Sequence, residues 1–95
     1  MIDWLKYPVS HPQVASRVVD GTAVIVLADS GEVNMLNSVG TRVWELVDGK
    51  RSVRDIANSI IAEYDVAADV AERDVASFMQ LLVDAKAVTL QDQPR

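Results

Sequence analysis

The stretch that decides the fold is "MLNSVGTRVWELVDG", Met35–Gly49, where the spacing of apolar residues changes from that of a strand to that of a helix. Asn37 is a good N-cap, because its side chain can accept a hydrogen bond from a first-turn amide. The apolar residues that follow at helical spacing are Val39, Val43, Trp44, Leu46 and Val47. Gly49 stands where a helix can stop, since glycine tolerates a left-handed backbone. We therefore expect a helix here, with Trp44 as the largest side chain of its buried face.

Three strands are predicted before this helix. Residues 14–19 ("VASRVV") lead into Asp20-Gly21, a favoured hairpin dipeptide. Residues 22–28 ("TAVIVLA") are almost continuously apolar, which is typical of a strand covered on both faces. "DSG" at 29–31 makes a second tight turn, and "EVNML" at 32–36 supplies the third strand. Short turns between successive strands predict an antiparallel meander.

Two more helices are predicted after Gly49. Ser52 and Asp55 resemble a capping box and open the second helix. Its apolar stripe is Val53, Ile56, Ala57, Ile60, Ile61 and Tyr64. The third helix runs from about Asp69 to Lys86, with an acidic start that suits the helix dipole. Its expected buried arc is Val75, Phe78, Leu81, Leu82 and Ala85. The order of elements predicts an α+β fold, a three-stranded antiparallel sheet followed by three helices.

We expect one domain over residues 14–90, between an N-terminal tail (1–13) and a C-terminal tail (91–95). Pro8 and Pro12 lack amide donors, so no regular structure is expected in the first tail. Trp4 and Tyr7 leave an alternative, in which they fold back over apolar surface or help to form a binding site. "AVTL" at 87–90 can add a short last strand, and "QDQPR" at 91–95 is expected to fray.

The composition argues against several classes of protein. The 95 residues contain no Cys and one histidine, His11, so no structural zinc site or thiolate nucleophile is expected. No positioned acid, base or cofactor motif is found, and we expect neither an enzyme nor a cofactor. No run approaches the roughly 18 apolar residues of a membrane span. A net charge of −5 repels nucleic acid. A cytoplasmic protein is expected.

Several segments in order carry a family resemblance. They are "LN" at 36–37, Gly40, "VWELVDG" at 43–49, "SVRDIA" at 52–57, Tyr64 and "DVASFMQLL" at 74–82. Together they resemble the PqqD family, which includes a small protein of pyrroloquinoline quinone biosynthesis. It also includes the RiPP recognition elements, peptide-binding domains of systems that modify ribosomally made peptides, such as lasso peptides. The resemblance covers about residues 12–90 and implies a winged-helix-like fold.

The resemblance also implies a function. The leader of a precursor peptide would bind as an added strand and be presented to a partner enzyme, such as a radical-SAM enzyme, a cyclase or a leader peptidase. The strand edge that accepts it would belong to Glu32, Val33, Asn34, Met35 and Leu36. The wall beside it would be one face of the third helix, with Val70, Asp74, Ser77 and Leu81.

Three of these residues have alternative roles. Alternation directs Met35 and Leu36 to opposite faces of the strand, and Leu36 is expected to enter the core. Met35 is the better candidate for a peptide pocket, because its thioether adapts to varied partners, although ordinary core packing is equally open. Asp74 could bind a basic group or an amide of the peptide, or instead form a structural contact with Arg17 or Arg73.

Two other functions remain open. A strand that is apolar on both faces favours a protein–protein adaptor or a homodimer, in which another subunit covers the exposed face of the sheet. A DNA-binding winged helix would have the same architecture but needs a basic recognition helix. The third helix instead contains Asp69, Glu72, Asp74 and Asp84 against Arg73 and Lys86. Its charge disfavours binding to DNA.

Overall fold

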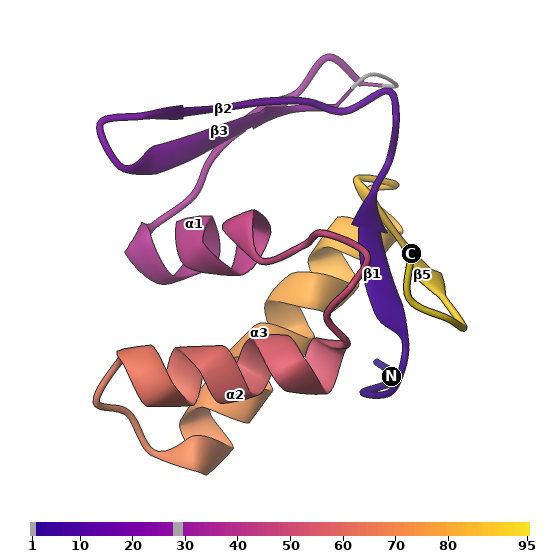
Figure 1. Ribbon diagram of the computed structural model, residues 1–95. Coiled ribbons are helices and arrows are strands. Elements are labelled where there is room, and N and C mark those ends of the chain that lie inside the picture. Colours follow the sequence, from indigo (N-terminus) through magenta and orange to yellow (C-terminus); the bar gives the residue numbers. More distant parts are fainter. Residues whose placement is uncertain (1, 28–29) are drawn as a thin grey trace.

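The computed structural model describes residues 2–27 and 30–95, which form two antiparallel sheets and three helices (Figure 1). The larger sheet has the strand order β2 (Ala15–Val19), β3 (Thr22–Val26) and β4 (Val33–Met35). The smaller sheet pairs β1 (Tyr7–Ser10) with β5 (Val88–Gln91). The helices are α1 (Ser38–Glu45), α2 (Val53–Glu63) and α3 (Ala68–Asp84). The predicted α+β fold is confirmed.

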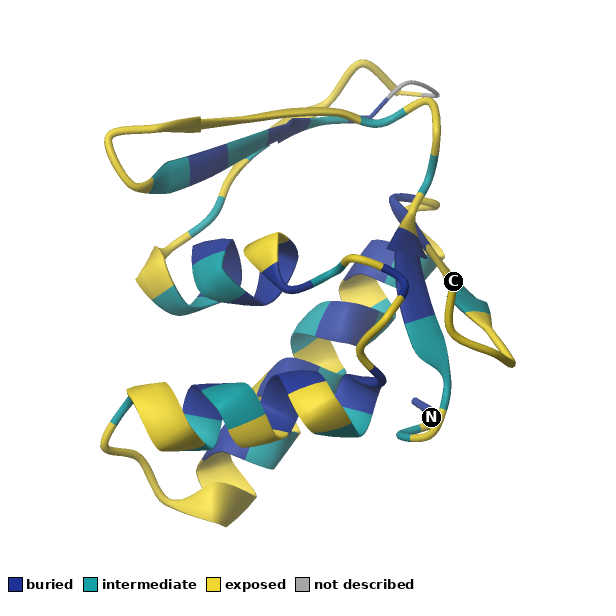
Figure 2. Cartoon of the chain, in the orientation of Figure 1, coloured by how far each residue is buried: buried dark blue, intermediate teal, exposed yellow. Residues whose placement is uncertain are grey.

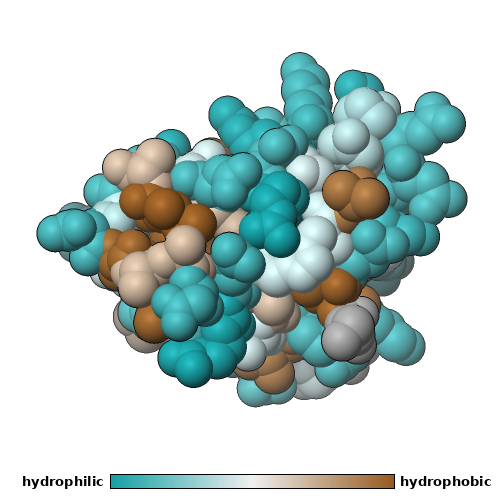
Figure 3. Space-filling view, turned by 90° about the horizontal axis from the view of Figure 1, so that it is seen from below, coloured by the Kyte–Doolittle hydropathy of each residue, from teal (hydrophilic) through white to brown (hydrophobic). Residues whose placement is uncertain are grey.

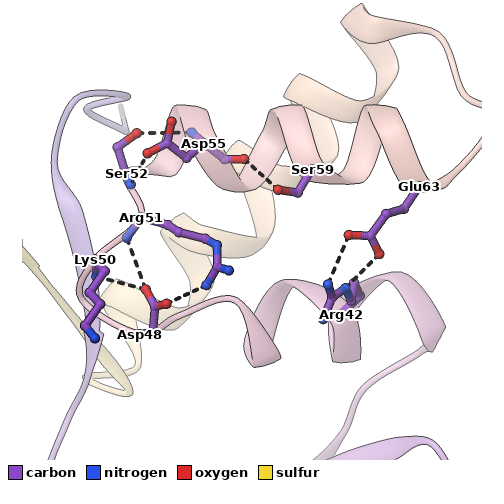
Figure 4. A network of polar contacts seen from close by, with 8 residues as sticks. All are labelled: Arg42, Asp48, Lys50, Arg51, Ser52, Asp55, Ser59 and Glu63. Carbon is purple, nitrogen blue, oxygen red and sulfur yellow. Dashed lines mark hydrogen bonds and ion pairs between the residues drawn. The ribbon is translucent and has the colours of Figure 1, made fainter.

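Local capping interactions begin the first two helices as expected. Asn37 Oδ1 accepts a hydrogen bond from Gly40 N at 2.7 Å, which fixes the start of α1. Ser52 Oγ accepts from Asp55 N at 3.1 Å and Asp55 Oδ2 accepts from Ser52 N at 3.0 Å, so the capping box of α2 is complete (Figure 4). α1 ends at Glu45, earlier than the glycine stop predicted, although Gly49 has the expected positive φ of 78°.

The core lies between the larger sheet and the helices, where the buried positions of each element face one another (Figure 2). Trp44 belongs to this core, as predicted, with 8% of its surface exposed. The predicted arc of α3 is buried only in part. Val75 and Leu82 are buried, whereas Leu81 is 66% exposed. Met79, which the predicted arc omits, is completely buried.

β3 is covered on one face and not on both, which corrects the prediction for residues 22–28. Ala23 and Ile25 are buried under the helices, but Val24 and Val26 on the outer face are half-buried. The predicted continuation of the strand to Ala28 and the turn that starts at Asp29 lie outside the described residues. The outer face is therefore a partly exposed apolar surface.

The N-terminal aromatics, Trp4 and Tyr7, lie away from the outer face of β3. Trp4 packs against the core and lies beneath the guanidinium of Arg54, 4.5 Å from its ring centroid. Tyr7 is the first residue of β1. Both aromatics belong to the part of the chain beside the helices, so they do not cover the outer face of β3.

The segment before Val14 contains a regular strand, which corrects the expectation of an irregular tail. β1 pairs with β5, the short terminal strand that was predicted. Pro8 fits within β1 because its carbonyl oxygen accepts from Gly49 N at 3.1 Å. The two main-chain groups of a strand residue point to the same side, so the missing amide of Pro8 faces away from β5 and removes no bond from the ladder.

The ends of the chain are also attached to the helical layer. The amides of Val53 and Arg54, in the first turn of α2, donate to Lys6 O at 3.0 Å and Trp4 O at 2.9 Å. These bonds satisfy amides that a helix start leaves unpaired. Arg95 N donates to Gly49 O at 2.8 Å. The last residue is therefore bonded to the loop after α1, and the predicted fraying of residues 91–95 is wrong at Arg95.

The face seen from below is mixed in character, with hydrophilic residues surrounding separate groups of apolar ones (Figure 3). Within residues 2–27 and 30–95, no helix combines the length and apolarity needed to cross a bilayer.

Candidate functional site

β4 lies at an edge of the larger sheet and has β3 as its one strand partner in the described chain. Leu36 N donates to Ala23 O at 2.9 Å, so the main-chain groups of Leu36 at this end of the ladder point toward β3. In an antiparallel pair, successive residues direct their amide and carbonyl groups to opposite sides. Val33 and Met35 therefore direct theirs away from β3. The open edge offers two amides and two carbonyls to a further strand.

A groove runs between this edge and α3. It consists of two adjoining cavities of about 570 and about 340 Å³. Both cavities are lined by Met35, Leu36, Phe78 and Leu81. The larger one extends over α1 and also contacts Asn37, Val39, Gly40, Val43, Asp74, Val75 and Ser77. The smaller one extends under the sheet and also contacts Ile25, Leu27, Glu32, Asn34, Leu82 and Ala85. β4 and α3 thus run in opposite directions along the groove.

The structure brings most of the predicted site residues together. Those that line the groove are Glu32, Asn34, Met35, Leu36, Asp74, Ser77 and Leu81. Val33 lines neither cavity and is 60% exposed opposite Val26, while Val70 lies near the start of α3, before the groove begins. The role of all nine in binding remains a prediction.

The part of the groove wall that α1 forms was not predicted from the sequence. Val39, Gly40 and Val43 form one end of the larger cavity, beside Phe78 of α3. A Cβ at Gly40 would lie 3.1 Å from Asn37 Oδ1, which is tight, and 3.6 Å from Phe78 Cζ, which is an ordinary contact, so the glycine mainly accommodates the cap of α1 at this end of the cavity. The conspicuous glycine within a predicted helix was the signal that could have located this wall.

Thr41 holds the groove side of the sheet to α1. Its side chain is buried, and its Oγ1 accepts from Ala23 N at 2.9 Å and donates to Leu36 O at 3.4 Å. The hydroxyl thus bridges β3 and the end of β4 at the point where the chain leaves the sheet to enter α1. This contact helps to hold the open edge in place relative to the helices.

The alternatives for Met35 and Leu36 are decided by burial. Met35 is 73% exposed, so ordinary core packing does not account for it. Leu36 is partly buried against the core, as expected.

The ion pairs also decide between the two roles considered for Asp74. It forms no ion pair with Arg17 or Arg73 among the described residues, so the structural contact considered for it is absent. The Asp74 carboxylate lies on the groove wall and is available to a ligand.

The charged residues that line the groove are both acidic. They are two exposed carboxylates, Glu32 and Asp74. Away from the groove, Arg42 donates to both carboxylate oxygens of Glu63, at 2.7 and 3.0 Å, and joins α1 to α2 (Figure 4). This hydrogen bond holds the pKa of Glu63 below its ordinary value. In the described chain, no basic side chain forms such an ion pair with Glu32 or Asp74.

Comparison with known proteins gives a family for the chain. The family described as Coenzyme PQQ synthesis protein D (PqqD) matches residues 22–88. The chain belongs to the PqqD family. The matched region runs from the start of β3 to the start of β5, so this PqqD-family region contains the whole groove.

Two solved structures are similar to this PqqD-family chain. "TbiB1 in Complex with the TbiA(beta) Leader Peptide" has a TM-score of 0.77 and 28% sequence identity, with 84% of this chain and 93% of that chain covered. "Lasso peptide synthetase B1 complexed with the leader peptide" has a TM-score of 0.74 and 28% identity, with 86% and 96% covered. No curated protein sequence matches the chain. The resemblance to RiPP recognition elements is confirmed.

Proposed function

We propose that this chain is a non-catalytic domain that binds the leader of a ribosomally made precursor peptide as a strand added to β4. The observation that carries the proposal is the open edge of β4 beside a groove walled by α3. The two similar solved structures, which hold leader peptides, support it. Residues 14–90 would form the binding domain and act in the cytoplasm, where precursors are synthesised.

Main-chain hydrogen bonds alone would bind the leader weakly. The four groups that Val33 and Met35 direct outward can contribute about 0.5–1.5 kcal/mol each, or roughly 2–6 kcal/mol in total. Micromolar affinity requires about 8 kcal/mol. The difference must come from side chains of the leader that enter the groove, because burial of apolar groups contributes most where a pocket excludes water.

The groove supplies the walls for such side chains. Phe78 and Leu81 from α3 and Leu36 from the sheet surround the part common to both cavities. An extended peptide directs alternate side chains to one side, so every second residue of the leader would face α3. This arrangement lets the peptide be recognised by shape at a few positions while the main chain supplies the alignment.

The same arrangement supports a non-catalytic role. The groove is lined by apolar side chains, amides, a serine and two separated carboxylates, and no group of metal-ligating residues lies within the described ranges. We propose that the chemistry belongs to a partner enzyme, a radical-SAM enzyme, a cyclase or a leader peptidase, to which the domain presents the bound precursor.

Isothermal titration with the leader of the precursor encoded beside this protein's gene tests the proposal. We expect a dissociation constant of about 1 μM or lower. Amide chemical shifts should change at residues 32–36 and 70–81 on binding. Changes confined to α2, or to the other sheet edge at β2, would show that the leader does not bind as a strand on β4.

A further inference from the structure

We infer that the bound leader segment carries two cationic residues, one beside Asp74 and one beside Glu32, with apolar residues between them. The inference rests on the proposed function, since it takes the groove as the binding site. It specifies the chemical class of the peptide that the groove selects.

The two carboxylates lie at opposite ends of the groove. Asp74 lines the larger cavity together with Asn37 and Gly40, beyond the end of β4. Glu32 lines the smaller cavity together with Ala85, at the start of β4. A peptide that follows β4 therefore passes one carboxylate and then the other.

Neither carboxylate is paired with a basic side chain among residues 2–27 and 30–95. Arg73, which is adjacent to Asp74 in sequence, lines neither cavity of the groove. By contrast, four basic residues elsewhere are ion-paired: Lys6 with Asp92, Arg42 with Glu63, Arg51 with Asp48, and Arg54 with Glu72. A cation on the peptide would supply the missing partner at each end.

The middle of the groove has a different character. The residues shared by its two cavities are apolar: Met35, Leu36, Phe78 and Leu81. An apolar or aromatic side chain of the peptide is therefore expected between the two cations.

The dimensions of the walls set the spacing of these residues. Four residue steps from Glu32 to Leu36 span about 13 Å at about 3.3 Å per residue. Eleven steps of α3 from Asp74 to Ala85 span about 16 Å at about 1.5 Å per residue. An extended peptide covers this length in about four to five steps. Because alternate side chains of an extended peptide face the groove, the two cations are about four positions apart.

A displayed library of random 12-residue peptides, selected on the immobilised full chain, tests the inference. We expect Lys and Arg to be enriched over the unselected library, in pairs about four positions apart. The double variant Asp74→Asn with Glu32→Gln should lose this enrichment, because both side chains keep their size and lose their charge. Asp74→Lys with Glu32→Lys should instead select Asp and Glu.

A matched control separates local contacts from the attraction of the net charge. Asp20→Asn with Asp65→Asn removes the same two charges from exposed positions that line neither cavity of the groove. A peptide selected on the wild type should bind this control with unchanged affinity. Each neutralised groove carboxylate should weaken the same peptide about two- to fivefold, the range of exposed ion pairs.

The outcomes distinguish this inference from the proposed function. Enriched peptides without basic residues, or equal weakening by the control variant, would overturn the charge preference and leave strand addition intact. If the wild type enriches no peptide relative to the groove variant Leu81→Asp, both the charge preference and the binding site are wrong.

Discussion

The two open edges of the larger sheet, β2 and β4, offer the same main-chain groups to a further strand. On β4 these belong to Val33 and Met35. On β2 they belong to Ser16 and Val18, because the register pairs Arg17 with Val24 and alternate residues point outward. β2 is the longer strand, and all five of its residues are exposed. By hydrogen bonding alone, β2 would be the better acceptor.

The edges differ in what faces them. α3 and α1 build a groove beside β4, and neither cavity of this groove is lined by a residue of β2. The region that matches the PqqD family begins at residue 22, so it includes β4 and leaves β2 out. An open edge is thus a template but not yet a binding site. We expect the wall beside it to supply most of the affinity and of the selectivity.

A charge placed on the groove wall should have the largest effect. Leu81→Asp puts a carboxylate among the apolar residues where the leader must bind, and we expect a loss of at least about 2 kcal/mol, or about 30-fold, in affinity. Leu81 is 66% exposed, so the stability should change little. Val18→Asp on β2, at a residue 47% exposed, is the control. Titration calorimetry that gives equal losses for both variants would remove the distinction between the edges.

Proline at the open edge tests the main-chain contribution. Val33→Pro removes an amide that points away from β3, so it breaks no bond of the β3–β4 ladder and leaves a carbonyl of the bound peptide unpaired. We expect binding to weaken by about 2 kcal/mol, or about 30-fold. Val18→Pro makes the equivalent change on β2 and should leave affinity unchanged. If calorimetry shows Val33→Pro to bind like the wild type, the leader does not pair with β4.

Thr41→Val tests how the β4 edge is held in place beside the helices. The substitution leaves the buried amide of Ala23 without its 2.9 Å hydrogen bond, and we expect the free energy of unfolding to fall by about 1.5 kcal/mol. Urea denaturation measures this change. Hydrogen exchange should also accelerate at Leu36 more than in β2. Thr89→Val, at an exposed position of β5, should alter neither, and equal effects of the two variants would mean that the bridging hydroxyl has no special role.

The smallest effect is expected from Glu63→Gln, which breaks the ion pair between α1 and α2 and touches neither edge. Arg42 lowers the pKa of Glu63 in the folded protein. The stabilisation by this carboxylate is therefore present above its ordinary pKa and is lost as the pH falls through the lower folded value. Thermal unfolding should show a small decrease for the variant near pH 7 that disappears at acidic pH, once Glu63 is protonated in the folded protein as well. Altered leader affinity at pH 7 would show that this contact influences the groove.

Local signals in the sequence predicted most of the elements. The Asn37 cap, the Ser52–Asp55 box and the Asp20-Gly21 hairpin each act within a few residues, so the sequence alone reveals them. The pairing of Tyr7 with Gln91 and the capping of α2 by Lys6 O join distant segments. No local pattern encodes these contacts, and the proline in β1 argued against the strand.

The site was predicted to a similar extent. Spacing and family resemblance indicated β4 and one face of α3, and seven of the nine predicted residues line the groove. The wall from α1 was missed because Val39 and Val43 follow the apolar spacing of an ordinary core helix. Apolar spacing does not distinguish a side chain that fills the core from one that also borders a cavity. Val33 was included as part of the strand edge, and its main-chain groups do point outward, but its side chain lines neither cavity.

The short length of β4 also bears on how long a precursor would stay bound. A three-residue strand offers few main-chain hydrogen bonds. We take the expected dissociation constant of about 1 μM, and proteins commonly associate at about 10⁵–10⁷ M⁻¹ s⁻¹. The product of these values is a dissociation rate of about 0.1–10 s⁻¹. A precursor would therefore remain bound for roughly a tenth of a second to ten seconds. Such a dwell time allows one domain to deliver many precursors in succession, whereas a longer edge would retain each one and slow turnover.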